Sequence, residues 1–204
     1  MDNMSYFSRV SQYIETIEPS IVYELLNSIW KTHNSAKIFT IGNGGSISTA
    51  AHFANDLKSL SSGFQVICLN DANTMSCIAN DRGYDLVFYE QILSLAIPGD
   101  LVIMLSASGN SPNLLKAIDA CRYNCVSCAG IVGFDGGEVK KLVDICVHVN
   151  SPLGQYREVE DCHSILCHYI VDQIDKAMQS IGKVPAGFNR GSINMMENLI
   201  NFYD

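Results

Sequence analysis

Short apolar runs alternate with stretches of helical periodicity along most of this chain. The apolar runs predict strands near residues 37–41, 64–69, 100–105, 127–132 and 144–149. The stretches between them predict helices near residues 46–60, 73–80, 85–96, 111–123 and 136–142. Strands that alternate with helices imply right-handed crossovers and a parallel sheet covered on both faces. We therefore expect an α/β fold, built as a three-layer α/β/α sandwich.

Helical segments flank this alternating region. Residues 3–33 predict one or two helices, and a long helix is expected over 157–181, ended by Gly182 and Pro185. The last residues contain a short amphipathic stretch around Met195, Leu199 and Phe202, which is either an arm that docks on a neighbour or a loosely held terminus. A chain of 204 residues is expected to form one domain, residues 1–204, with a helical segment at 1–33, a core at 37–182 and a tail at 183–204.

Two loops rich in glycine and serine predict a binding site for an anion. One is Gly-Asn-Gly-Gly-Ser at 42–46, and the other is Ser-Ala-Ser-Gly-Asn-Ser at 106–111. Each follows a predicted strand and opens a predicted helix, where unpaired N–H groups and the helix dipole favour negative charge. Neither loop has the spacing of a dinucleotide or Walker loop, so a small phosphorylated ligand fits better. The alternative is that these residues serve only the geometry of tight turns.

Composition narrows the class of partner and the compartment. The net charge of −8 argues against direct binding of nucleic acid, which needs a basic face. No apolar run reaches the roughly 20 residues of a membrane span, and no apolar leader is visible, so we expect a cytoplasmic protein with reduced thiols. Cys121, Cys125 and Cys128 raise the alternative of a zinc site, but no matching ligands lie nearby, and structural thiols are favoured. Cys68 and Cys146 are expected to be small buried residues.

Acidic residues and histidines on two predicted helices are candidates for chemistry. His52 and Asp56 are four residues apart and share one helix face, which suits a metal or a base beside its orienting group; a plain surface pair is the alternative. Glu160 and His168 are eight apart, about 12 Å of helical rise. Periodicity alone pairs Glu160 better with His163, which we expect to be a packing histidine.

The ordered motifs resemble the sugar isomerase (SIS) domain family. They comprise the two loops, His52-Phe53-Ala54 with Asp56, Ala79-Asn80-Asp81, Gly133-x-Asp135-Gly136-Gly137, and His163 with His168. The resemblance implies a five-stranded parallel sheet of the flavodoxin-like kind and a homotetramer with active sites between subunits. It is closest to members that isomerise sedoheptulose 7-phosphate to D-glycero-D-manno-heptose 7-phosphate, an aldose–ketose isomerisation that supplies heptose for bacterial surface polysaccharides.

Carried over residue by residue, the resemblance implies one Zn²⁺ per subunit and a phosphosugar site. The implied metal ligands are His52, Asp56, Glu160 and His168. The implied substrate contacts are Asn43, Gly44, Ser46, Asn80, Asp81, Ser106, Ser108 and Ser111. Five positions depart from the family pattern: Asp56 replaces Glu, Glu160 replaces Gln, Ala107 replaces Thr, Leu60 replaces Arg, and Arg157 replaces Asp.

The chemistry of isomerisation assigns a role to each polar group. We expect Asp56 or Glu160 to act as base and His168 as acid, with His52 as a metal ligand. Two other functions remain open. The losses at Leu60 and Ala107 favour an isomerase of another phosphosugar. A tetrameric SIS adaptor that binds a bacterial replication initiator would keep the fold without the catalytic groups.

Overall fold

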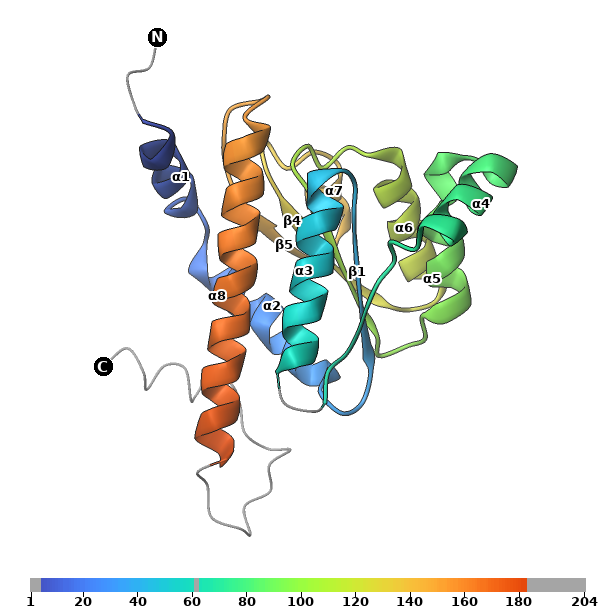
Figure 1. The fold of residues 1–204 in the computed structure, drawn as a ribbon, viewed down its shortest axis with the longest axis horizontal. Coiled ribbons are helices and arrows are strands. Elements are labelled where there is room, and N and C mark those ends of the chain that lie inside the picture. Colours follow the sequence, from blue (N-terminus) through green and yellow to red (C-terminus); the bar gives the residue numbers. More distant parts are fainter. Residues whose placement is uncertain (1–4, 61–62, 183–204) are drawn as a thin grey trace.

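The computed structural model describes residues 5–60 and 63–182, and it contains a five-stranded parallel sheet (Figure 1). The strands are β1 (Lys37–Gly42), β2 (Gln65–Cys68), β3 (Leu101–Ser106), β4 (Ser127–Val132) and β5 (Ile145–His148). Their order in the sheet is β2-β1-β3-β4-β5. The predicted α/β fold is thereby confirmed, and each predicted strand lies within one or two residues of its expected bounds.

The apolar runs form strands because both faces of the sheet are buried. Along β3, Leu101, Ile103 and Leu105 belong to one core cluster, whereas Val102 and Met104 point to the other. This alternation is the two-residue period of a strand, and the continuous apolar run reflects helices on both sides.

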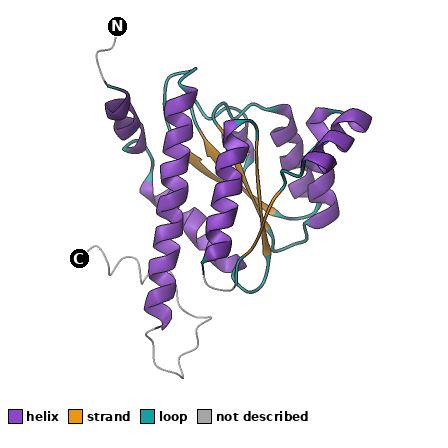
Figure 2. Cartoon of the chain, in the orientation of Figure 1, coloured by secondary structure: helices purple, strands orange, loops and turns teal. Residues whose placement is uncertain are grey.

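Helices complete the outer layers of the sandwich (Figure 2). One face is covered by α2 (Pro19–Thr32), α3 (Gly45–Ser59) and α8 (Tyr156–Gly182). The other is covered mainly by α5 (Tyr89–Leu95), α6 (Pro112–Tyr123) and α7 (Val139–Leu142), with α4 (Ala72–Arg82) beside them. Two predicted helices are shorter than expected: the segment 85–96 begins as a 3-10 turn, Tyr84–Leu86, and the segment 136–142 starts with a glycine turn before α7.

The N-terminal segment forms two helices, because Pro19 starts a new helix after the turn that ends the first. The first of them, α1 (Tyr6–Ile14), is capped by Ser5, whose hydroxyl accepts from the Ser8 amide. It packs against the first half of α8, where the Tyr6 hydroxyl donates to Asp161 at 2.6 Å. The predicted tail, 183–204, lies outside the described residues.

The eight cysteines differ in how far they are buried. All eight are free thiols; Cys121 and Cys128 are buried, whereas Cys125 is exposed, and these three form no metal-ligating group among the described residues. Cys68 and Cys146 are only half-buried, because they lie on β2 and β5, the two edge strands of the sheet. No helix in residues 5–60 and 63–182 is both long and apolar enough to cross a membrane.

Candidate active site

The strand order places both glycine-serine loops at one crevice. β1 and β3 are neighbours, although β2 and β3 are consecutive in the chain, so the connections after β1 and β3 diverge to opposite faces of the sheet. Ligands of open α/β sheets bind at such a switch point, at the carboxyl ends of the strands. The loop after β1 opens α3, and the loop after β3 opens α6.

The first loop presents the N-terminus of α3 without a side-chain cap. Gly44 occupies the cap position with φ of 53°, a conformation that favours glycine, and it makes no side-chain capping bond. Ser46, in that first turn, is buried.

A carboxylate from α8 lies directly against this helix start. A Cβ atom placed on Gly45 would meet both carboxylate oxygens of Glu160 at 2.6 Å. Gly45 therefore leaves the space that the Glu160 carboxylate fills. The dipole of α3 favours a negative charge at this place.

The second loop offers hydroxyls and amides around the N-terminus of α6. Ser106 is buried and its oxygen accepts from the Gly109 amide at 3.0 Å, while Ser108 accepts from Asn110 at 3.3 Å. Ser111 stands at the cap position of α6 but makes no capping bond, so its hydroxyl is available to a ligand. Gly109 has φ of 63°, and a Cβ there would lie 2.0 Å from the Gly136 carbonyl oxygen, so the following glycine turn packs tightly on this loop.

A pair of amides joins the two loops. Asn43 donates to Asn113 at 2.9 Å, and Asn113 donates back to Asn43 at 2.8 Å. The Tyr84 hydroxyl also donates to the Asn43 oxygen, at 3.0 Å. These residues, with Asp85, Ser111 and Pro112, line a pocket of about 360 Å³. Asn43 thus links the two loops and also lines the pocket. Tyr84 and Asp85 line the pocket too, and the sequence motifs did not predict them.

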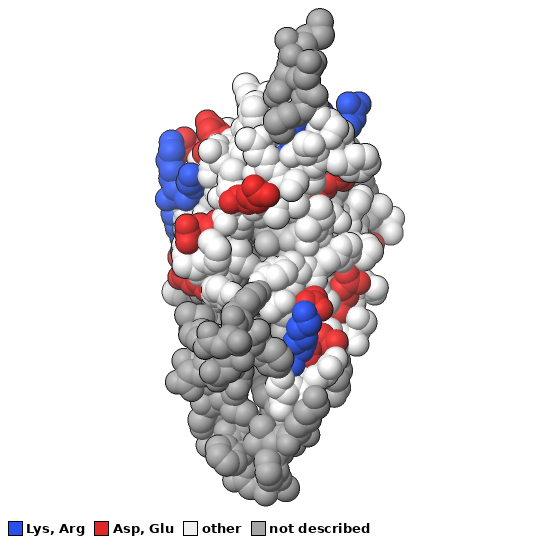
Figure 3. Space-filling model, turned by 90° about the vertical axis from the view of Figure 1, so that its left-hand side faces the viewer, with Lys and Arg blue, Asp and Glu red and all other residues white. Residues whose placement is uncertain are grey.

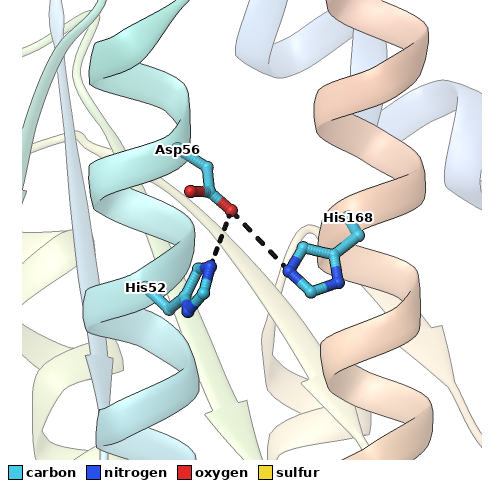
Figure 4. A group of neighbouring side chains, drawn as sticks. All are labelled: His52, Asp56 and His168. Carbon is cyan, nitrogen blue, oxygen red and sulfur yellow. Dashed lines mark ion pairs between the residues drawn. The ribbon is translucent and has the colours of Figure 1, made fainter.

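Three polar side chains gather between α3 and α8 (Figure 4). The nearer oxygen of Asp56 lies 3.2 Å from Nε2 of His52 and 3.8 Å from Nε2 of His168. The two imidazole rings meet edge to face, with centroids 5.2 Å apart. Both histidines are exposed and Asp56 is half-buried, so a ligand has access to the group. The i,i+4 spacing predicted the pair on α3, but only the packing of α8 on α3 brings in His168.

The donor set of this cluster fits zinc. Two ligand atoms on one tetrahedral zinc lie about 3.3–3.5 Å apart, given zinc–ligand distances near 2.1 Å. One ligand atom from each of the three residues lies within 4.8 Å of the others. Among the described residues no other group of three metal-ligating side chains is so compact. Glu160, predicted as a fourth ligand, is not in this group, because its side chain turns toward Gly45 instead.

Other predicted residues lie apart from these groups. Asn80 and Asp81 are exposed in the last turn of α4 and bond to each other, Asn80 donating to Asp81 at 2.8 Å. His163 is buried, as expected for a packing histidine, and its burial lowers its pKa to about 4, opposed weakly by the Val132 backbone. Leu60 and Ala107, at two positions that depart from the family pattern, are buried in core clusters.

Comparison with known proteins identifies the family. Residues 5–133 match the SIS domain. A phosphoheptose isomerase of Trichlorobacter lovleyi is 32% identical over 185 residues, which cover 88% of this chain and 92% of the relative. One from Vibrio parahaemolyticus is 35% identical over 147 residues, 70% of this chain and 76% of the relative.

Solved structures agree with these sequence matches. The phosphoheptose isomerase of Neisseria gonorrhoeae has a TM-score of 0.72 at 30% identity, covering 82% of this chain and 92% of that one. The Francisella tularensis enzyme has a TM-score of 0.77 at 24% identity, covering 84% and 95%. This chain therefore belongs to the SIS domain family and, within it, to the phosphoheptose isomerases.

Proposed function

We propose that this protein converts sedoheptulose 7-phosphate to D-glycero-D-manno-heptose 7-phosphate, a step in making heptose for bacterial surface polysaccharides. The observation that carries the proposal is the compact group of His52, Asp56 and His168 between α8 and α3, the helix that the first loop opens. The names of the relatives supply the substrate, and the cluster supplies groups suited to aldose–ketose chemistry.

The phosphate group of the substrate binds at the second loop rather than the first. The Glu160 carboxylate lies at the start of α3, where its negative charge repels a phosphate. At the α6 terminus the Ser111 hydroxyl makes no capping bond, and Ser106 and Ser108 lie at the start of the loop that leads to it. The phosphate therefore anchors one end of the sugar and uses its binding energy to position the reacting carbons elsewhere.

The reacting end of the sugar meets the cluster between α3 and α8. Isomerisation moves one proton from C1 to C2 and another from the C1 hydroxyl to the C2 carbonyl oxygen. In this proposal Asp56 accepts the carbon-bound proton, and His168 moves the proton between the two oxygens. A zinc ion, held by His52 with Asp56 and His168, would stabilise the negative charge of the enediolate.

Replacement of His168 tests this assignment. His168→Gln should lower kcat at least ~100-fold, the scale of acid–base catalysis, because the proton transfer between oxygens loses its donor. The matched control is Asp172→Ala, which removes an exposed residue paired with Lys176 one turn further along α8. Turnover followed by NMR, with circular dichroism to check the fold, is the measurement. A His168→Gln variant with wild-type turnover would overturn the role of His168.

The assembly that fits this family is a homotetramer, which we propose to be cytoplasmic. An apolar groove of about 230 Å³ runs between the N-terminal helices and α8, lined by residues such as Ile17, Val22 and Ile165. Much of the described surface on this side of the molecule lacks charged side chains (Figure 3). Such a face suits contact with further copies of the chain.

A second candidate function changes only the sugar. Leu60 and Ala107 are buried and offer no polar atom beyond the backbone where the family has Arg and Thr. Isomerisation of a different phosphosugar is therefore the alternative that these positions favour. A panel of five-, six- and seven-carbon ketose phosphates, compared by kcat/KM, separates the two.

A further inference from the structure

The turn between β4 and α7 packs directly on the second loop. The Val139 amide donates to the Gly109 carbonyl oxygen at 2.9 Å, and the Glu138 amide donates to the side-chain oxygen of Asn110 at 3.0 Å. Gly109 also lies so close to the Gly136 carbonyl that an added Cβ would be 2.0 Å from its oxygen. The position of the second loop therefore depends on the position of this turn.

Lys140, on α7, lies against the same turn. A Cβ placed on Gly136 would be 2.5 Å from Cδ and 2.8 Å from Cβ of Lys140, so the stem of the lysine covers this glycine. The Lys140 amide also donates to the Gly136 carbonyl oxygen, at 3.2 Å. Gly136 thus contacts both Lys140 and Gly109, and it links the lysine to the second loop.

The Lys140 ammonium is held by a histidine. It donates to Nδ1 of His148, the last residue of β5, at 3.0 Å, and Nε2 of His148 donates to the Phe134 carbonyl oxygen at 2.9 Å. An ammonium has no acceptor, so Nδ1 must accept and the imidazole must be neutral. Burial, reinforced by the Lys140 charge and opposed by the Phe134 carbonyl and Asp135, lowers the pKa of His148 and favours this neutral form.

This pairing leaves the lysine with its charge. Within residues 5–60 and 63–182, Lys140 makes no ion pair with a carboxylate, whereas its neighbour Lys141 lies 2.7 Å from an oxygen of Glu138. The second loop contains no basic residue, and the chain carries a net charge of −8. A cation fixed at this turn therefore opposes the repulsion that the whole molecule exerts on an anion.

We propose that Lys140, held by His148, is a positioning residue for the second loop, and that its charge favours the phosphate group bound there. The inference rests on the function proposed above, in which this loop binds the phosphate. The lysine stem supports the loop through Gly136, and the ammonium adds a positive charge that the loop serines lack. His148 holds the ammonium without neutralising it, as a carboxylate in its place would do.

Titration with inorganic phosphate tests the role of Lys140. Lys140→Met keeps an unbranched stem against Gly136 and removes the charge, so phosphate affinity should fall about 3- to 10-fold, the scale of one partly screened charge. The loss should shrink at about 0.5 M salt, and Lys140→Arg should recover most of the affinity.

Lys141→Met is the matched control. It removes the same charge from the next residue of α7, and because that charge is already paired with Glu138, phosphate affinity should change less than about twofold. Equal losses in Lys140→Met and Lys141→Met would overturn the proposal, and so would an unchanged affinity in Lys140→Met.

Variants of His148 test whether the lysine must be held. His148→Gln keeps an acceptor and a donor, so phosphate affinity should stay within about twofold of wild type. His148→Leu removes both, and the freed lysine should weaken phosphate binding about 3- to 10-fold, the scale of one lost hydrogen bond. Circular dichroism and urea unfolding check that both variants fold. Wild-type affinity in a folded His148→Leu protein would contradict the role of His148.

Kinetics separate this inference from the proposed function. With sedoheptulose 7-phosphate, Lys140→Met should raise KM about as much as it weakens phosphate binding and leave kcat within about twofold, and a fall in kcat at unchanged KM would overturn the role. If wild type binds phosphate but does not turn over this sugar, the proposed function fails, and the phosphate titrations still decide the role of Lys140. If wild type binds no phosphate, the role of Lys140 fails as well.

Discussion

At the scale of residues, the surroundings of each histidine indicate whether it serves the fold or the chemistry. His52 and His168 are exposed and face a shared carboxylate, whereas His163 is buried one helix turn before Cys167 on α8. The exposed pair can exchange protons with a ligand. The buried residue has a lowered pKa and stays neutral, so it serves packing.

The burial of His163 makes stability depend on pH in a definite direction. Below its ordinary pKa of 6.5 the unfolded chain binds a proton that the folded state, with a pKa of about 4, does not. The folded state therefore loses stability as pH falls from 6.5 toward 4, by about 2 kcal/mol at pH 5.

His163→Leu tests this dependence, because it keeps an apolar side chain of similar bulk and removes the titrating group. Urea unfolding at pH 7.5 and pH 5.0 measures how much free energy of unfolding each protein loses between the two pH values. The variant should lose about 2 kcal/mol less than wild type between the two values. If wild type and His163→Leu lost the same free energy of unfolding, His163 would not have different pKa values in the folded and unfolded states.

At the scale of elements, strand ends and loops were predictable while contacts between helices were not. The strands follow from apolar runs, and the loops from Gly and Ser at their ends, so both crevice loops could be placed from the sequence. The meeting of His168 with Asp56, and of Glu160 with Gly45, depends on how α8 lies against α3. Periodicity along one helix carries no information on that packing, so these contacts could not be predicted from the spacing of the residues.

The second loop depends on a close approach between Gly109 and the turn at Gly136. Gly109→Ala places a Cβ 2.0 Å from a carbonyl oxygen, in a backbone conformation with φ of 63°. We expect strain of about 1–2 kcal/mol, an added packing cost of about 1–3 kcal/mol, and loss of inorganic phosphate binding.

Gly99→Ala is the matched control. Gly99 also has positive φ, at 98°, but a Cβ there meets no atom within 4 Å. Urea unfolding and phosphate titration of both variants measure the difference. A Gly109→Ala protein that is as stable as Gly99→Ala and binds phosphate normally would contradict this prediction. It would show that the second loop can move away from Gly136 without losing its function.

At the scale of the whole molecule, the groove between the N-terminal helices and α8 predicts association. Ile165 lines this groove and is 45% exposed in the single chain. Ile165→Glu should prevent the proposed tetramer from forming, since it places a charge on a face that association would bury. Ile97→Glu is the control, because Ile97 is 58% exposed and lies outside the groove.

Sedimentation analysis of the three proteins gives the result. Wild type and Ile97→Glu should sediment as tetramers, and Ile165→Glu as a smaller species with unchanged circular dichroism. A tetrameric Ile165→Glu protein would place the interface on another face. A monomeric wild type would contradict the assembly itself.

We expect the cluster between α3 and α8 to perform a metal-assisted isomerisation of a heptulose phosphate. The most direct measurement is NMR of the purified wild-type protein with sedoheptulose 7-phosphate, after chelation and again with added Zn²⁺. Heptose 7-phosphate should form at a rate that rises with zinc. A folded protein that forms none under either condition would contradict it.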